Sequence, residues 1–224
     1  MTSQPFISVR GEASLEVDPE IAIISVQVRA RDKDRRRALD LLAVRNNKVL
    51  STVRAQGDAV EKVESGPASL QPEFKDGGKA RERVTAYVAH ATVSVTIADF
   101  TILGDLVTSL ADGEMVAVRG PWWSLRPDSP VFRQVRVSAA HDALQRAREY
   151  ADAFGGEVTG LVELADPGLD MGRPPQVRHM VASRAAAFEA SAAQPEELEF
   201  EPAKQTVRAE VDARFTVTVP ALGQ

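Results

Sequence analysis

Residues able to catalyse a reaction are few and scattered in this sequence. It contains no cysteine, so a thiolate nucleophile, a disulfide and a cysteine metal site are all excluded. The histidines are His90, His141 and His179, and they show none of the spacings that zinc sites use. Asp18 and Glu20 come nearest to a carboxylate pair, and a reverse turn explains them better than acid–base chemistry. The sequence therefore predicts no catalytic or metal-binding residue and no enzymatic activity.

Motifs for nucleotides, nucleic acids and membranes are also missing. We find no Walker loop, dinucleotide glycine fingerprint, G-x-S-x-G elbow or H-E-x-x-H pair, so no cofactor is expected. The run Arg35-Arg36-Arg37 could bind an anion, but a solvated helix face is the simpler interpretation. A formal net charge of −5 argues against a nucleic-acid partner, which needs a basic face. No apolar run reaches the roughly 18 residues of a membrane span.

The adjacent pair Trp122-Trp123 is the most unusual local feature of the sequence. Neighbouring residues of a strand point to opposite faces, so both indoles can share one core only if Gly120-Pro121 forms a bulge that twists them. We expect one indole to lie in the core. The other either covers an interface between subunits, where tryptophan is enriched, or is a second buried or loop-covered ring. Trp122 and Trp123 are therefore the candidate interface residues.

Charged residues of both signs occupy the outward positions of the first and last predicted strands. They are Arg10, Glu12 and Glu16 in the first strand, and Arg208, Glu210, Asp212 and Arg214 in the last. If these strands pair in one sheet, their charges form a cross-strand ladder. A solvated face is the default interpretation, but alternating charge also suits self-association in a defined register.

A long helix is predicted between Ser129 and Phe154. Ser129 can cap it, Pro130 suits its first position, and Gly155 supplies a left-handed stop. The apolar positions recur every three or four residues, at Phe132, Val135, Ala139, Ala143, Ala147, Tyr150 or Ala151, and Phe154. Because the stripe is mostly alanine, the helix can lie close against a sheet. Asp142 and Arg146 form a favourable pair on the outside.

Period-two alternation predicts the strands, and 3.6-residue periodicity predicts two further helices. The strands cover residues 7–17, 22–30, 60–70, 87–97, 114–125, 158–165 and 207–219. One helix follows a cap at Asp32 or Asp34 and ends near Gly57, and a short one starts at Asp99 or Thr101 and runs through Leu110. The order ββα-ββα-βα-ββ lacks regular βαβ alternation. It predicts an α+β fold of mixed or antiparallel sheets with helices packed on one face. The first two strands are expected to form a hairpin, and the two ββα units suggest a loose internal duplication.

The chain is expected to form a single domain over residues 1–224. The stretch 166–204 differs from the rest, because it contains several prolines and an alanine run without a clear period. We interpret it as a flexible excursion, with one helical turn around residues 182–190.

The opening ISVRGEASLEVDPEIAIISVQV resembles the start of SIMPL-domain proteins, named for a signalling molecule that associates with a pelle-like kinase. In that family a V-x-G strand precedes a Pro-Asp-type turn and a second strand. The likeness continues through Tyr87–Ile97, through Ala139–Gly156 with Val158–Leu164, and through Val207–Val219. It implies an α+β fold, no known enzymatic activity, ring- or channel-like homo-oligomers in some members, and an association with oxidative or envelope stress.

The sequence departs from this family at two points. Bacterial members typically carry a signal peptide and are periplasmic or secreted, whereas MTSQPFISVRG shows no such segment and predicts a soluble, cytoplasmic protein. The family's Pro-x-x-Pro-Gly approach to the last strand is reduced to Glu201-Pro202-Ala203.

Two functions remain open. The first is a non-enzymatic, self-assembling protein with a stress-related or scaffolding role, which needs an apolar patch at Trp122 or Trp123 or an exposed strand edge. The alternative is a small-ligand or protein-binding module that uses the sheet face, with 166–204 as a lid. Such a module needs a pocket of about 300–1,000 Å³.

Overall fold

The computed structural model describes residues 5–74, 84–167 and 198–218. The helical turn predicted around 182–190, and most of the predicted excursion over 166–204, lie outside the described residues. The chain forms two compact units. The terminal unit contains Met1–Val17, Pro127–Ser191 and Thr206–Gln224, and the central unit contains Asp18–Arg126 and Ala192–Gln205. That both belong to a single domain stays a prediction.

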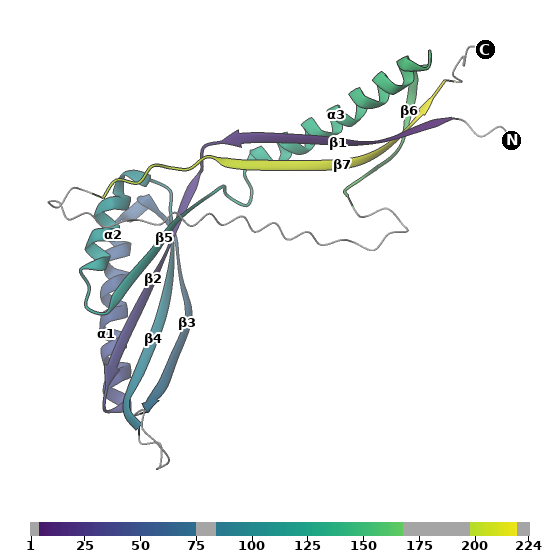
Figure 1. Cartoon of the computed structure of the whole chain (residues 1–224). Helices are drawn as coiled ribbons and strands as arrows, with labels where there is room; N and C mark the ends of the chain where they lie inside the picture. Colours follow the sequence, from purple (N-terminus) through teal and green to yellow (C-terminus); the bar gives the residue numbers. More distant parts are fainter. Residues whose placement is uncertain (1–4, 75–83, 168–197, 219–224) are drawn as a thin grey trace, which may run out of the picture. The chain divides into compact units, whose positions relative to one another are not determined.

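A three-stranded sheet and one helix build the terminal unit (Figure 1). Its elements are β1 (Phe6–Val17), α3 (Pro130–Ala153), β6 (Val158–Ala165) and β7 (Gln205–Val217). The strand order is β1-β7-β6, and β6 pairs antiparallel with β7. The arrows of β1 and β7 point in opposite directions, and the Val217 N–H donates to the Pro5 carbonyl at 3.1 Å. The first and last strands therefore pair, as the charge-ladder interpretation required.

Helix α3 begins and ends where the sequence predicts. The Val131 N–H donates to the Ser129 hydroxyl at 3.3 Å, and Gly155 adopts a φ of +70° after the last turn. The buried stripe consists of Val135, Ala139, Ala143, Ala147 and Ala151, whereas Tyr150 and Phe154 are exposed. Alanine and not the aromatic side chains therefore forms the contact with the sheet.

The alanine stripe lets α3 approach β1 very closely. A β-carbon built on Gly11 of β1 would lie 2.0 Å from the Ala139 carbonyl oxygen and 2.6 Å from the Ala143 nitrogen. Asp142 adds a second link, because it accepts a hydrogen bond from the Glu12 N–H of β1 at 2.9 Å. It also forms the predicted ion pair with Arg146, at 2.9 Å. The predicted close approach of helix and sheet is thus confirmed.

Four strands and two helices build the central unit. They are β2 (Ile21–Asp32), α1 (Arg35–Arg54), β3 (Val60–Phe74), β4 (Val84–Ile97), α2 (Leu103–Ala111) and β5 (Val116–Ser124). The sheet has the order β3-β4-β2-β5, and every neighbouring pair is antiparallel. The connectivity βαββαβ with this order is a split βαβ arrangement.

The predicted hairpin of the first two strands is wrong. β1 and β2 belong to different sheets, in different units. The proposed repeat of two ββα units is wrong for the same reason, because the central unit repeats β2-α1-β3 as β4-α2-β5. Alternation in sequence shows that a strand has one buried face, but not which strand lies beside it. The α+β class and the antiparallel pairing are confirmed.

The main core of the central unit lies between its sheet and helices α1 and α2. Every second residue of β2, from Ala22 to Ala30, is buried, and so are Val93, Val95 and Ile97 of β4. Phe200, which follows the undescribed segment, is half-buried and packs against this same core. Leu198 runs so close to α2 that a β-carbon on Gly104 would lie 2.3 Å from its carbonyl oxygen.

β5 is an edge strand of the central sheet, and its irregular point lies at Gly120-Pro121. Its register against β2 shifts between Ile23 and Ser25, opposite this pair, and the Gly120-Pro121 peptide bond is cis. Gly120 has a φ of +107°, and a β-carbon there would lie 2.8 Å from the Ile23 carbonyl oxygen. Glycine is therefore required at this irregular point of the edge.

Candidate functional site

The two predicted interface tryptophans lie on opposite faces of the central sheet. Trp123 pairs with the buried Ala22 on the helix side, and its ring meets the ring of Phe100 edge to face at 4.9 Å. Trp122 pairs with Ile23 on the other face, and half of its surface (50%) is exposed. One indole thus packs against the core, as expected. An interface at Trp122 stays a prediction.

The face of the terminal sheet that lies opposite α3 carries the charge ladder predicted from the sequence. Arg10 of β1 donates two hydrogen bonds to Asp212 of β7, from Nε at 2.7 Å and from Nη2 at 2.9 Å. Its Nη1 lies 3.6 Å from the Glu210 carboxylate. The hydrogen bond to Asp212, together with its charge, raises the pKa of Arg10 above the usual value. Arg10 is therefore a cation that a two-point contact with Asp212 holds in place.

Arg214 of β7 is held more loosely than Arg10. Its Nε donates to the Ser8 hydroxyl of β1 at 3.3 Å, and its guanidinium lies over the Phe6 ring at 5.0 Å from the centroid. On the other side, Nη1 lies 3.8 Å from the Glu163 carboxylate of β6, which is an ion pair but too long for a hydrogen bond. The ladder thus extends from β1 through β7 to β6.

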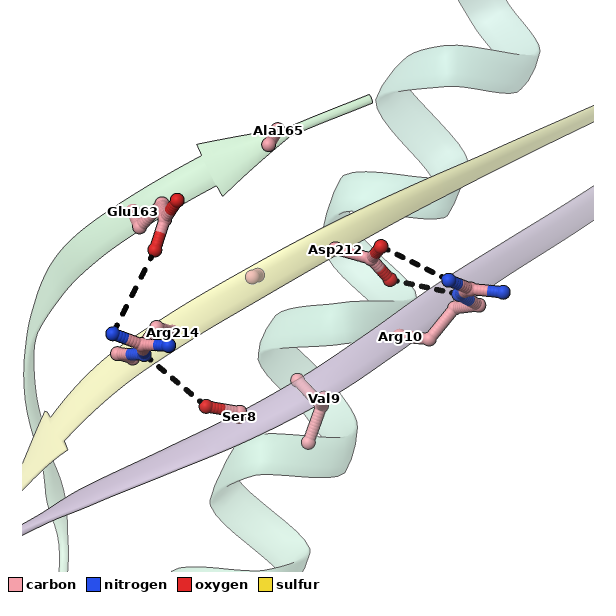
Figure 2. Close-up of a pocket in the computed structure, with 8 residues that line it drawn as sticks. Ser8, Val9, Arg10, Glu163, Ala165, Asp212 and Arg214 are labelled. Carbon is pink, nitrogen blue, oxygen red and sulfur yellow. Dashed lines mark hydrogen bonds and ion pairs between the residues drawn. The ribbon is translucent and has the colours of Figure 1, made fainter. Parts of the chain in front are cut away.

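A hollow of about 320 Å³ opens along this ladder (Figure 2). Its lining residues come from all three strands of the terminal sheet, and they are Ser8, Val9, Arg10, Glu163, Ala165, Asp212, Ala213 and Arg214. Figure 2 shows Glu163 and Ser8 on either side of Arg214, and Asp212 turned toward Arg10. Two cations and two carboxylates can bind or orient a charged ligand.

Apolar side chains lie exposed on β6, the edge strand of the same sheet. Leu161, Val162 and Leu164 expose 57%, 54% and 52% of their surface, and we call them the β6 apolar strip. Leu161 pairs with Phe215 and Leu164 with Ala213, residues whose side chains pack against α3. These leucines therefore lie on the helix side of the sheet, yet α3 leaves them uncovered. Two register shifts, at Val158/Gly160 and Leu161/Glu163, interrupt the strand.

Sequence reasoning missed Ser8, Glu163 and the β6 apolar strip as site residues. A signal for the strip was present, because the adjacent residues Leu161 and Val162 cannot both face one core in a regular strand. Ser8 and Glu163 gave no signal of their own. Their roles depend on which strands flank β7, and alternation does not fix the strand order.

The residues considered for catalysis are not brought together. His90 lies half-buried on β4 of the central unit, His141 is exposed on α3 of the terminal unit, and His179 lies outside the described residues. Glu20 accepts a hydrogen bond from the Arg126 N–H at 2.9 Å, which is a structural role. Among residues 5–74, 84–167 and 198–218, no three His, Asp or Glu side chains gather as a metal site would require. Nor is any helix in these ranges long and apolar enough to cross a bilayer.

Comparison with known proteins gives relatives whose names state no activity. One is the 26 kDa periplasmic immunogenic protein of Brucella melitensis, 27% identical over 182 residues that span 76% of this chain and 72% of that protein. Another, named uncharacterized protein YggE, comes from Edwardsiella ictaluri and is 22% identical over 190 residues, 85% of this chain and 79% of that protein.

Among solved structures, a crystal structure of an amidase of the hydantoinase/carbamoylase family from Burkholderia phymatum aligns with a TM-score of 0.27 and 16% identity. The alignment covers 59% of this chain, which spans 36% of the amidase. A TM-score this low carries no argument about fold or activity.

The family resemblance seen in the strand and turn motifs is borne out over nearly the whole chain. A family model described as SIMPL, protein of unknown function (DUF541), matches residues 7–215. This range includes the whole central unit and nearly all of β1 and β7. The chain belongs to the SIMPL family.

Proposed function

We propose that this protein is a non-catalytic SIMPL-domain protein that assembles with copies of itself and has a scaffolding or stress-related role. The observation that carries the proposal is the β6 apolar strip. Three large apolar side chains, each more than half exposed, follow one another within eight residues at the edge of a sheet. Exposed apolar edges are a liability that monomeric proteins avoid, and burying them is a driving force for association.

The register shifts within β6 favour contact through side chains. They break the regular row of backbone donors and acceptors that an added strand would need. The leucines, in contrast, stand beside α3 and offer an apolar surface to a second subunit. Trp122 on the central unit is the second candidate contact, as the sequence suggested.

The relatives support a location in the cell envelope. The Brucella proteins are named periplasmic, and the cytoplasmic location expected from the sequence has no support among them. We therefore include a periplasmic location in the proposal. Fractionation of cells that express the full-length gene tests it, and recovery only in the cytoplasm would contradict it.

Assembly is tested by absolute mass in solution, from light scattering after size exclusion at two protein concentrations and two salt levels. We expect a discrete oligomer, and the double variant Leu161→Lys/Leu164→Lys should shift it toward the 24.2 kDa monomer. Val44→Lys is the matched control, because Val44 is 69% exposed on α1 and lies outside the strip. A monomer at every condition would refute assembly, and an oligomer that the β6 variant leaves intact would move the contact to Trp122, to be tested by Trp122→Ala.

A second function is supported by the hollow on the terminal sheet. Its volume of about 320 Å³ reaches the lower end of the range typical of small-molecule sites. Its lining is charged and mostly half-exposed, which favours a small polar ligand over an apolar one. Ligand binding and assembly use opposite faces of the terminal sheet, so one protein can do both.

A further inference from the structure

The four charges of the hollow are not equally engaged. Arg10 and Asp212 form a two-point hydrogen-bonded pair at 2.7 and 2.9 Å, so each largely satisfies the other. Arg214 and Glu163, in contrast, approach only to 3.8 Å. Arg214 donates a single side-chain hydrogen bond, to Ser8 at 3.3 Å, and within the described chain Glu163 accepts none. The hollow therefore offers free guanidinium donors beside a free carboxylate.

We propose that this hollow binds a small zwitterion of the amino-acid or short-peptide kind. Its carboxylate would take the free N–H groups of Arg214 together with the Ser8 hydroxyl, and its ammonium group would donate to Glu163. A guanidinium matches a carboxylate in geometry as well as in charge, because it presents parallel donors. The inference rests on the second function proposed above, ligand binding, and does not depend on assembly.

The charges around the hollow exclude simpler ligands. The two guanidiniums and two carboxylates that line the hollow sum to zero, and Glu210 lies 3.6 Å from Arg10, so the site gives a polyanion no net attraction. An anion bound at Arg214 would lie beside the Glu163 carboxylate, and a cation bound at Glu163 would lie beside Arg214. A ligand that carries both charges satisfies both groups and removes each repulsion.

The hollow is large enough for a small ligand. Ala165, which pairs with Asp212, adds only a methyl group to the lining, and the side chains of the lining residues Val9 and Ala213 pack on the α3 side of the sheet. A volume of about 320 Å³ accommodates an amino acid or a dipeptide but not a folded protein surface. Because Arg214 and Glu163 keep 41% and 45% of their side-chain surface exposed, water screens the contacts and binding should be weak.

The test is an NMR titration with L-alanine and with L-alanyl-L-alanine, followed at the backbone amides of Ser8, Glu163 and Arg214. N-acetyl-L-alanine, which lacks the ammonium group, and L-alaninamide, which lacks the carboxylate, are the comparison ligands. We expect saturable shifts with at least one zwitterion and at least tenfold weaker binding of each singly charged analogue. Absence of saturation with both zwitterions, or equal binding of the analogues, would overturn the inference.

Variants test whether Arg214 and Glu163 make the contacts with the ligand. Arg214→Gln and Glu163→Gln should each weaken zwitterion binding at least tenfold. Arg208→Gln is the matched control, because Arg208 lies on the same face of β7, outside the hollow, and should bind as the unmodified protein does. Equal weakening in all three variants would show nonspecific charge effects and contradict the proposed site. Light scattering of the same samples distinguishes ligand binding from assembly. A variant that loses ligand binding but keeps its mass in solution contradicts nothing in the assembly proposal.

Discussion

Gly11 occupies the tightest contact described in the terminal unit. The Ala139 carbonyl oxygen lies 2.0 Å from the position that a β-carbon would take, and the Ala143 β-carbon lies at 2.7 Å. No flexible side chain can move aside, because two of the three nearest atoms belong to the backbone of α3. The spacing between helix and sheet therefore depends on the absence of one side chain.

Gly11→Ala should destabilise the protein by about 2 kcal/mol or more, because α3 must move away from β1 and lose contacts along the alanine stripe. Chemical denaturation followed by circular dichroism measures the effect. Gly57→Ala is the control for a glycine without neighbours, since nothing lies within 4 Å of a β-carbon there, although its φ of +58° adds some strain. A Gly11→Ala variant as stable as the unmodified protein would contradict the close packing.

Single residues also determine how the charges of the ladder are paired. Arg10 and Arg214 are two cations on facing strands, but Asp212 stands opposite Arg10, whereas Ser8 stands opposite Arg214. The Arg10 guanidinium thereby makes two hydrogen bonds to a carboxylate, whereas the Arg214 guanidinium makes one, to a hydroxyl. The difference between a structural pair and a candidate binding group depends on a single cross-strand neighbour.

At the scale of the element, the regular end of β5 places two identical side chains in different environments. The register shift opposite Gly120-Pro121 precedes the tryptophans, and the strand is regular again from Trp122 to Ser124. Consecutive residues therefore alternate between the faces, and only Trp123 reaches the core. The bulge does not twist the two indoles into one cluster.

Trp123→Ala should lower the free energy of unfolding by about 2 kcal/mol or more, because it opens a cavity beside Phe100. Trp122→Ala should change the stability of the isolated chain by less than about 0.5 kcal/mol, since its ring is half exposed. Denaturation of both variants makes the comparison, at a protein concentration at which light scattering gives the mass of a monomer. Equal losses in the two variants would contradict the opposite orientations.

The whole molecule contains two cores of different construction. The central core combines Val, Ile and Leu from a nearly continuous stretch of chain, whereas the terminal core consists of alanines and a few larger residues from three separate stretches. The terminal core buries less apolar surface, and bringing its three stretches together costs more conformational entropy. Both effects lower the stability of the terminal core. The two units should therefore differ in local stability even within one domain.

Native-state hydrogen exchange tests this difference. Amides of α3, β1 and β7 should exchange through openings of lower free energy than amides of β2 and β4, and Gly11→Ala should widen the gap. Identical opening free energies throughout the two units would show that the chain unfolds as one cooperative body.

Local physics made much of the fold predictable from the sequence. Alternation located the strands, the three-to-four-residue period located the helices, and Ser129, Pro130 and Gly155 fixed the limits of α3, because capping and φ preferences act over a few residues. The charge ladder also followed, since alternation places Arg10 and Asp212 on outward faces. The nearly all-alanine stripe correctly indicated a close helix–sheet contact.

Tertiary structure alone decided which strands are neighbours. Pairing joins residues some 200 positions apart in β1 and β7, while β1 and β2, adjacent in sequence, enter different sheets. The hollow exists only because β7 lies between β1 and β6, and the β6 apolar strip is exposed only because α3 packs on β1 and β7. A residue's type sets what it can bind, but its neighbours across the sheet determine whether its charge is already satisfied.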